Sequence, residues 1–170
     1  MDNKDWEIQL NKQIPGLRRY ARALAQDIQS ADDLVQDCLE RAWKKRSYWK
    51  EGTNLRAWLF SIMHNLFINM VRRKKLANNF ENQLALNSNG NQSSGDSSHI
   101  VHDLAKCLSR LKPEYREVVL LAGLENMSYK EIAKVTSTPI GTVMSRLSRG
   151  REELRRLMAA TGEPKLVRVK

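Results

Sequence analysis

The side chains best suited to chemistry lie near the C-terminus, on a segment that begins at Pro139 and runs to about Met158. At about 100° per residue on a helix, four polar side chains there fall within about 100° of arc: Thr142, Ser145, Arg146 and Arg149. Arginine can fork to the two acceptors of guanine in the major groove, and threonine and serine reach phosphates or bases. No acidic residue interrupts this part of the segment, so the pattern predicts a DNA-reading surface.

Three further arginines follow on the same segment and would extend its positive field toward phosphates: Arg151, Arg155 and Arg156. The alternative is an ordinary surface helix in which these arginines pair with Glu152 and Glu153. That alternative explains the downstream charges but not the lack of acid in the N-terminal part, so we favour DNA binding.

A second polar cluster lies on a helix expected to start at Ser30. Its acidic and amide side chains share about 100° of arc: Asp33, Gln36, Asp37 and Glu40. An acidic face in a basic protein suits a basic partner surface, and the alternative is a plain solvated face; the sequence leaves this choice open. A metal-dependent nuclease using Asp32, Asp33, Asp37 and Glu40 is a poor fit. Two-metal sites gather ligands from several elements around a pocket, and these residues share one exposed helix face. We therefore expect no enzyme.

An aromatic and basic segment interrupts the helical pattern at residues 46–54, where Tyr48, Trp49 and Lys50 are consecutive. Four basic residues end the next expected helix: Arg72, Arg73, Lys74 and Lys75. Rings and cations together could grip an unstacked base and its phosphates. The alternatives are that the rings belong to the core and that the cations complement the helix dipole, although four in a row exceed that need.

The remaining candidates for chemistry carry little weight. His99, His102 and Cys107 could be metal ligands, but one end of a tether and one core thiol make a poor tetrahedral site. Cys38 and Cys107 are too few for a disulfide framework and fit buried, reduced thiols. We expect no metal, no cofactor and no catalytic residue.

Helices must position all of these side chains. In the first part of the chain, apolar spacing predicts a helix over residues 17–28, a second from Ser30 with Asp33 completing a capping box, and a long third one capped by Thr53 or Asn54. The expected core stripe of the third helix comprises Leu55, Trp58, Leu59, Ile62, Met63, Leu66, Phe67 and Met70. The opposite strip carries Ala57, Ser61, His64, Ile68 and Arg72.

In the second part, a short helix closes before Pro113, which suits the first position of the next helix. Ser128 and Glu131 form another capping box. A turn at residues 136–138 separates this short helix from the long one that starts at Pro139 and turns Val143, Leu147, Gly150, Leu154 and Leu157 inward. A short helix, a tight turn and a longer helix are typical of the helix-turn-helix.

Charge and composition divide the chain in two. The 170 residues carry a formal net charge of +10, which segregates as −3 over residues 1–40, +9 over 41–77, −3 over 78–103 and +7 over 104–170. Residues 87–98 contain no apolar side chain and predict a flexible tether. No apolar run approaches the roughly 18 residues that cross a bilayer, so we expect a soluble, cytoplasmic protein. The predicted division is a domain over 1–77, a linker over 78–99, a domain over 100–160 and a tail over 161–170.

Five segments are similar to a known family. Residues 31–43 (ADDLVQDCLERAW) and 55–65 (LRAWLFSIMHN) resemble domain two of bacterial sigma factors. Residues 111–119, 128–133 and 139–147 resemble domain four. Two such domains joined by a short linker resemble the extracytoplasmic-function group, which implies an all-α fold of two small helical domains, the second a helix-turn-helix.

The resemblance also implies roles for the clusters. The acidic face on Asp33, Gln36, Asp37 and Glu40 would dock on the clamp helices of the RNA polymerase β′ subunit, and the helices over 104–123 would help bind the β flap. The minus-thirty-five element would be read by Thr142, Ser145, Arg146, Ser148 and Arg149. The minus-ten element would be melted and read by Tyr48, Trp49, Lys50, Asn54, Arg56, Ser61, His64, Asn65, Arg72 and Arg73.

The partners so implied are core RNA polymerase, promoter DNA and an anti-sigma factor, with no membrane insertion and a monomer when free. The alternative is a stand-alone helix-turn-helix regulator of transcription. Such regulators usually dimerise on palindromic sites, and no segment of this sequence resembles a dimerisation or ligand-sensing domain.

Overall fold

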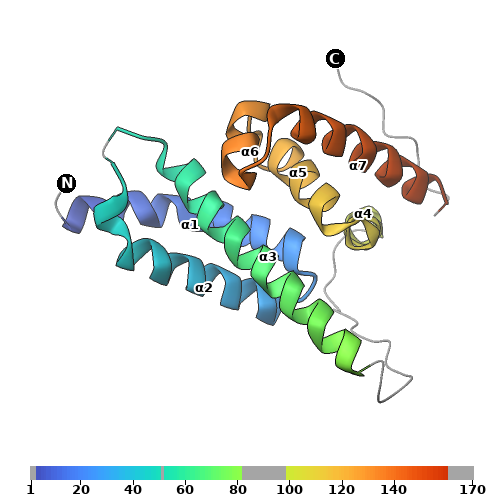
Figure 1. The fold of residues 1–170 in the computed structure, drawn as a ribbon, viewed down its shortest axis with the longest axis horizontal. Helices are drawn as coiled ribbons and strands as arrows, with labels where there is room; N and C mark the ends of the chain where they lie inside the picture. Colours follow the sequence, from blue (N-terminus) through green and yellow to red (C-terminus); the bar gives the residue numbers. More distant parts are fainter. Residues whose placement is uncertain (1–2, 51, 82–98, 161–170) are drawn as a thin grey trace. The chain divides into compact units, whose positions relative to one another are not determined.

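The computed structural model describes residues 3–50, 52–81 and 99–160, and every regular element in those ranges is a helix (Figure 1). The helices form two compact units. The first unit contains the helices up to α3, and the second contains α4, α5, α7 and most of α6. The predicted all-α fold of two small domains is confirmed. In chain order the elements are α1 (Asn3–Ala25), α2 (Ile28–Lys44), the 3-10 turn η1 (Arg46–Tyr48), α3 (Leu55–Glu81), α4 (His99–Arg110), α5 (Pro113–Gly123), α6 (Tyr129–Thr136) and α7 (Ile140–Ala160).

Helix α1 is longer than the predicted helix 17–28. Trp6 and Leu10 extend its apolar stripe toward the N-terminus and are both buried, so the helix begins at Asn3. It ends at Ala25 because Gln26 adopts a left-handed backbone with φ of 71°. The predicted end at residue 28 is therefore wrong.

Helix α2 starts at Ile28, so the predicted cap at Ser30 is also wrong. Asp27 is the cap, and its Oδ1 accepts a hydrogen bond of 2.7 Å from the Ser30 N–H. Burial alone would raise the pKa of the Asp27 carboxyl, but the hydrogen bonds from Ser30 and the attraction of Lys74, whose Nζ lies 3.7 Å from Oδ2, outweigh it. The pKa of Asp27 is consequently lower than that of an ordinary aspartate.

The first unit packs α1, α2 and α3 around a common core. The rings of Tyr20 and Phe60 meet there with centroids 5.1 Å apart. Cys38 is fully buried, as expected, and burial raises the pKa of its thiol to about 12. Most of the predicted stripe of α3 is buried, with Phe60 in addition: Leu55, Leu59, Met63, Leu66 and Phe67, while Trp58, Ile62 and Met70 are half-buried.

The basic run at residues 72–75 does not end α3, as predicted, but lies inside it. The helix continues to Glu81, because residues 76–81 contain neither glycine nor proline to stop it. Residues 78–81 of the predicted linker 78–99 are thus helical, and so is its last residue, His99, at the start of α4. Residues 82–98 and the predicted tail 161–170 lie outside the described residues.

In the second unit, a buried arginine ties α5 to the end of α4. Arg116 donates hydrogen bonds of 2.8, 2.7 and 3.1 Å to the carbonyl oxygens of Leu108, Ser109 and Leu111. Burial lowers the pKa of its guanidinium, which still stays charged at neutral pH. It satisfies carbonyl groups that a helix end leaves without partners. The adjoining apolar cluster joins α4 to α7 through Cys107, Leu111, Leu154 and Met158.

The predicted helix-turn-helix is present in α6 and α7. The capping box is confirmed, because Ser128 N and Oγ both lie 2.8 Å from Glu131 Oε2. The turn after α6 places Ser137 at φ of 50°, and Pro139 precedes the first turn of α7. The inward residues of α7 are buried at Val143, Leu147, Gly150 and Leu154, with Leu157 half-buried and Met158 buried in addition.

Candidate nucleic-acid and protein interfaces

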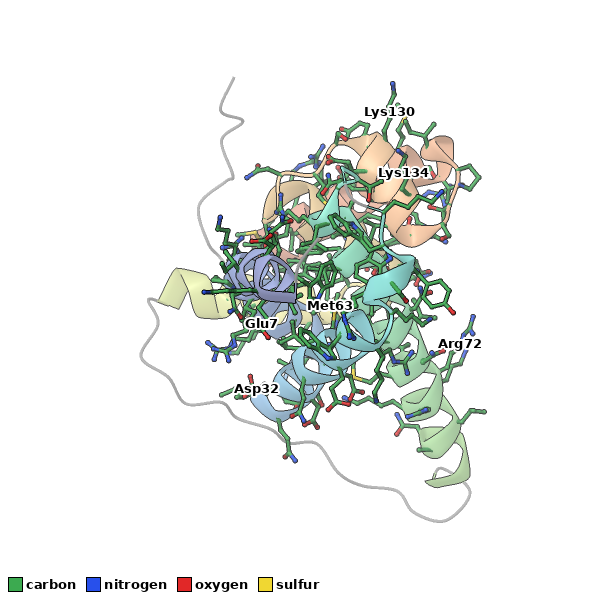
Figure 2. The ribbon with its side chains drawn as sticks, turned by 90° about the vertical axis from the view of Figure 1, so that its left-hand side faces the viewer. Glu7, Asp32, Met63, Arg72, Lys130 and Lys134 are labelled. Carbon is green, nitrogen blue, oxygen red and sulfur yellow. The ribbon has the colours of Figure 1, made fainter. Side chains whose placement is uncertain are left out.

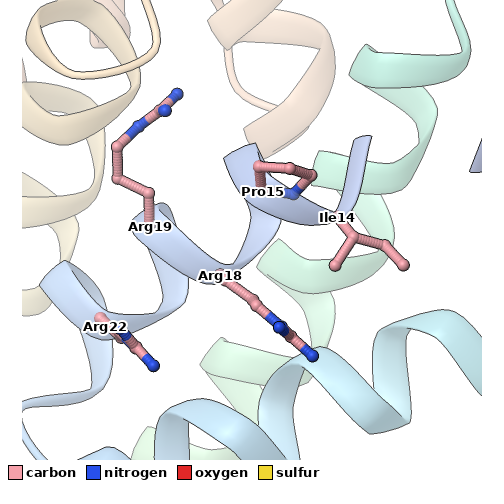
Figure 3. Close-up of a pocket in the computed structure, with 5 residues that line it drawn as sticks. All are labelled: Ile14, Pro15, Arg18, Arg19 and Arg22. Carbon is pink, nitrogen blue, oxygen red and sulfur yellow. The ribbon is translucent and has the colours of Figure 1, made fainter. Parts of the chain in front are cut away.

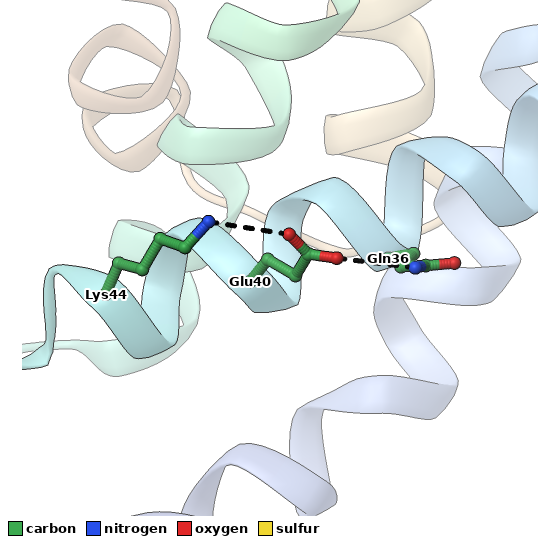
Figure 4. A network of polar contacts seen from close by, with 3 residues as sticks. All are labelled: Gln36, Glu40 and Lys44. Atoms are coloured by element: carbon green, nitrogen blue, oxygen red, sulfur yellow. Dashed lines mark hydrogen bonds and ion pairs between the residues drawn. The ribbon is translucent and has the colours of Figure 1, made fainter.

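The acidic cluster lies on one exposed face of α2. Gln36 Nε2 donates to Glu40 Oε1 at 3.3 Å, and Lys44 Nζ lies 3.6 Å from Glu40 Oε2 (Figure 4). Both charged side chains of that pair are more than half exposed, so the pair is weak and a partner can displace it. The carboxylates of Asp33 and Asp37 have no hydrogen-bond or ion-pair partner within the described residues, which leaves two anionic groups open to a protein surface.

The acidic residues of this face do not converge on a pocket with Asp32. Asp32 points outward from α2 (Figure 2). Across the described ranges, no three His, Cys, Asp or Glu side chains gather as a metal site would require. The side chains of His99 and His102 lie outside the described residues.

The aromatic segment between α2 and α3 presents its two rings differently. Tyr48 is 80% exposed, and Lys50 is exposed as well. Trp49 is half-buried, and its ring packs against that of Trp6 with centroids 5.3 Å apart. Of the two predicted caps, Thr53 and Asn54, it is Asn54 that caps α3, because its Oδ1 accepts a hydrogen bond of 3.0 Å from the Ala57 N–H.

The polar strip on α3 mixes half-buried and exposed groups. Ser61 and His64 are half-buried, and the Ser61 hydroxyl donates to the Trp58 carbonyl at 2.7 Å. Asn65 is exposed and donates to the Ser61 carbonyl at 2.9 Å. The guanidinium of Arg56 lies 5.5 Å from the centre of the Phe60 ring.

In the basic run of α3, Arg72 points away from the bundle, whereas Met63, further toward the start of the helix, points into it (Figure 2). Lys74 is engaged with Asp27. Arg72, Arg73 and Lys75 are exposed and have no ion-pair partner within the described residues. Because these cations lie inside the helix rather than at its end, complementing the helix dipole does not explain them.

The N-terminal half of α7 carries the predicted DNA-reading strip. Arg146 and Arg149 have no ion-pair partner in the part of the chain that the structure describes. The Ser145 hydroxyl donates to the Thr142 carbonyl at 3.0 Å and remains exposed, as does Ser148. Thr142 and Arg146 are half-buried.

The C-terminal half of α7 is different. Arg155 pairs with Glu152, and Arg156 Nη2 lies 3.9 Å from Glu153 Oε1. The ion pairs of the surface-helix alternative thus form here, while Arg151 has none in the described residues. The arginines of α7 without an ion-pair partner in the described residues therefore lie between residues 146 and 151, and the paired ones follow them.

Four further side chains on α6 and α7 are exposed, and the sequence patterns do not single them out. Ile140 and Met144 are one turn apart on α7 and are 43% and 53% exposed. Lys130 and Lys134 on α6 are exposed and point outward (Figure 2). A helical wheel that counted apolar as well as polar groups would have found Met144 beside Ser145 and Ser148, because exposed apolar groups on a polar face are informative.

A further basic surface lies on α1. Arg18, Arg19 and Arg22 line an open hollow of about 510 Å³ together with Ile14 and Pro15 (Figure 3). The net charge of residues 1–40 does not reveal this basic surface, because the acidic groups in that range outnumber the basic ones.

Two protein-family models match this chain, one in each helical domain. The family model for the sigma2 domain of PhyR matches residues 10–64, and the model for sigma-70 region 4 matches residues 102–154. Two helical domains of these families, in this order, place the chain among proteins built from sigma-factor domains.

Similar proteins of known family show to which group of sigma-factor proteins the chain is related. The chain is 32% identical to the ECF RNA polymerase sigma factor EcfG of Rhodopseudomonas palustris over 151 residues, 88% of this chain and 82% of that protein. It is 32% identical to the ECF sigma factor SigE of Mycolicibacterium smegmatis, with 91% and 62% covered. The sigma factor RpoE of Bartonella quintana, solved in complex with the anti-sigma factor NepR, superimposes with a TM-score of 0.79 at 33% identity over 92% of this chain and 98% of that one.

This chain therefore belongs to the ECF RNA polymerase sigma factors, and the resemblance drawn from its sequence is confirmed. Proteins of this family are regulators of transcription initiation rather than enzymes. Residues 3–50, 52–81 and 99–160 contain no helix that combines the length and apolar character needed to span a bilayer.

Proposed function

We propose that this sigma factor holds core RNA polymerase through the acidic face of α2 and directs it to promoters through basic surfaces on α3 and α7. The observation that carries the proposal is the separation of charge. Within the described residues, the carboxylates of Asp33 and Asp37 have no ion-pair partner and share one face of α2. Cations without such a partner include Arg72, Arg73 and Lys75 on α3, and Arg146 and Arg149 in the first half of α7. Such segregation suits one basic protein partner and one polyanionic partner.

On the polymerase side, Asp33, Gln36, Asp37 and Glu40 would dock on the clamp helices of β′. The ion pair of Glu40 with Lys44 is exposed and weak, so exchanging it for a cation of the partner costs little. The helices α4 and α5 would help form the site for the β flap.

On the minus-ten side, the segment between α2 and α3 would capture an unstacked base. Tyr48 offers an exposed ring for stacking, with Lys50 beside it for phosphate. Trp49 would support this segment from within. The remaining contacts would come from α3 and its cap: Asn54, Arg56, Ser61, His64, Asn65, Arg72 and Arg73.

On the minus-thirty-five side, α7 would lie in the major groove. Arg146 and Arg149 would reach guanine, and Thr142, Ser145 and Ser148 would reach phosphates or bases. Met144 would contact a thymine methyl group, for which an exposed apolar side chain is suited. Lys130 and Lys134 would bind phosphates, because the first helix of such a motif crosses the DNA backbone.

The two DNA-binding domains would act together on the polymerase. With the predicted bounds moved to the end of α3 and the start of α4, we place sigma domain two at 1–81, the tether at 82–98, sigma domain four at 99–160 and a tail at 161–170. Neither DNA surface needs to bind tightly alone, since polymerase presents both at high effective concentration. The Bartonella quintana structure pairs a sigma factor with the anti-sigma factor NepR, and we propose that this chain, a monomer in the cytoplasm when free, is likewise held by an anti-sigma protein.

Runoff transcription tests the proposal. Core polymerase is incubated with genomic fragments, with this protein supplied or withheld. Transcripts that start at defined sites only when the protein is present are expected. The absence of any such transcript, from core polymerase that is active with another sigma factor, would refute the proposal.

A further inference from the structure

The segment between α2 and α3 is tied to the N-terminal turns of α1 by tryptophan rings. Trp6 is only 2% exposed and packs against Trp49 with ring centroids 5.3 Å apart and planes tilted by 51°. It also meets the edge of Trp58, on the first turn of α3, at 5.9 Å and 68°. These tilted and edge-on arrangements are the favourable ones for aromatic pairs. Figure 1 shows these turns of α1 beside the segment.

The hydrogen bonds found inside the segment are local. Tyr48 N donates to Lys45 O at 2.9 Å, and both N and Oγ1 of Thr53 donate to Lys50 O, at 3.1 and 2.7 Å. Gly52 turns the chain with a left-handed φ of 84°. Such bonds fix turns within the segment. Arg46 and Asn54 bind its two ends to α2 and α3, through Trp43 O and Ala57 N. The contact with α1 is made by the tryptophan rings.

The packing on Trp6 decides which ring faces outward. Trp49 is half-buried against it, and the preceding residue, Tyr48, is 80% exposed. If Trp49 left this contact, the segment could rotate and Tyr48 would lose its fixed direction. Trp6, which lies more than 40 residues earlier in the chain, is therefore placed to set the geometry of a DNA contact that it does not make.

We propose that Trp6 is a positioning residue for promoter opening, because it holds Trp49 inward and thereby fixes Tyr48 and Lys50 in the direction of the minus-ten element. The proposal rests on the proposed function of this segment. The indole N–H groups of Trp6 and Trp49 are buried and have no hydrogen-bond partner in the part of the chain that the structure describes. The contact thus depends on ring packing, and phenylalanine can replace Trp6 without losing a hydrogen bond.

The anchoring can be measured on the free protein by limited digestion with trypsin, since Lys45, Arg46 and Lys50 are cleavage sites within or beside the segment. Trp6→Ala should speed cleavage there about tenfold, and Trp6→Phe should restore it to within about threefold of wild type. Leu10→Ala is the matched control, because Leu10 is buried one turn further along α1. Trypsin should cut the segment of the Leu10→Ala variant at a rate within about twofold of the wild-type rate.

The functional consequence is measured with holoenzyme on a promoter fragment selected by the wild-type holoenzyme from a randomised library, with 2-aminopurine in the minus-ten element. At saturating core polymerase, Trp6→Ala should slow opening about tenfold, while its affinity for core stays within about twofold. Trp6→Phe and Leu10→Ala should open the promoter nearly as wild type does.

Three results are decisive. Equal effects of Trp6→Ala and Leu10→Ala in both assays would overturn the inference, because Trp6 would then only stabilise the fold. A Trp6→Phe variant as defective as Trp6→Ala would also overturn it. A wild-type holoenzyme that never opens the minus-ten element, while Trp6→Ala still speeds cleavage, would refute the proposed function and leave the anchoring in place.

Discussion

At Gly150, α7 packs closely against Tyr115 and Val119 of α5, and replacing this glycine with alanine should destabilise the second unit. A Cβ atom at this position would lie 2.8 Å from Val119 Cγ2 and 3.3 Å from both the Cβ and the carbonyl oxygen of Tyr115. Carbon atoms normally pack at about 3.5–4.0 Å. The Val119 side chain is stiff at χ1, and backbone atoms of Tyr115 cannot rotate away, so the helices must separate.

Two opposed effects set the size of the stability loss caused by Gly150→Ala. Overpacking costs about 1–3 kcal/mol, and exchanging glycine for alanine within a helix returns about 1 kcal/mol. We expect a net loss of about 1 kcal/mol, which lowers the melting temperature of a domain of this size by about 4–8 °C. Gly123→Ala is the matched control, because nothing lies within 4 Å of its Cβ position, and it should be neutral or slightly stabilising.

The assay exploits the distribution of tryptophan. All four tryptophans lie at or before residue 58, so their fluorescence reports unfolding of the first unit, whereas far-ultraviolet circular dichroism reports both. Gly150→Ala should lower the midpoint temperature of one unfolding transition seen by circular dichroism. The midpoint of the transition seen by tryptophan fluorescence should stay unchanged. If Gly150→Ala melts at or above the temperature of wild type, as Gly123→Ala should, the reasoning about this contact is refuted.

Three further predictions concern the surfaces and the cap. Asp37→Lys should lower affinity for core polymerase at least tenfold in a binding titration, whereas Glu7→Lys, the same charge change at an exposed site on α1 (Figure 2), should not; equal effects would remove the acidic face from the interface. Arg149→Ala should cost about 1–3 kcal/mol in discrimination at one upstream base pair and leave core affinity intact, while Arg156→Ala, which removes an arginine paired with Glu153, should leave base discrimination unchanged. Because the pKa of Asp27 is lowered in the folded state, its carboxylate stabilises the first unit above about pH 4, and this contribution is lost as the pH falls through the lower folded value. Asp27→Asn keeps a capping side chain but should show a weaker loss of stability over that range by tryptophan fluorescence, and an unchanged pH profile would contradict the ion pair with Lys74.

Local signals allowed much of the fold to be predicted. The caps at Asn54 and Ser128 and the helix start at Pro113 each depend on residues within one turn of the position that they mark. The start of α2 was missed because Ser30 and Asp33 imitate a capping box, while Asp27, three residues earlier, takes the role. Local patterns alone do not distinguish two competing caps so close together.

Contacts between distant residues were beyond such reasoning. The spacing of residues 46–54 predicts an aromatic, basic segment but not which ring is inward, because Trp49 is held by Trp6 on another helix. The end of α3 was placed at the basic run because cations are common at helix ends, yet the helix continues to Glu81. The polar pattern of the α7 strip does not indicate Met144, because that residue is apolar and only its exposure in the fold places it beside the polar groups.

A nuclease footprint on promoter DNA tests the central claim most directly, because that claim assigns polymerase binding to the acidic face and promoter binding to surfaces that act only when polymerase presents them together. The protein and core polymerase are each tested alone and then combined, at the same concentrations and salt. Protection of both promoter elements is expected only for the combination, and it should fall as salt rises. Equal protection of both elements by the protein without polymerase would contradict the account.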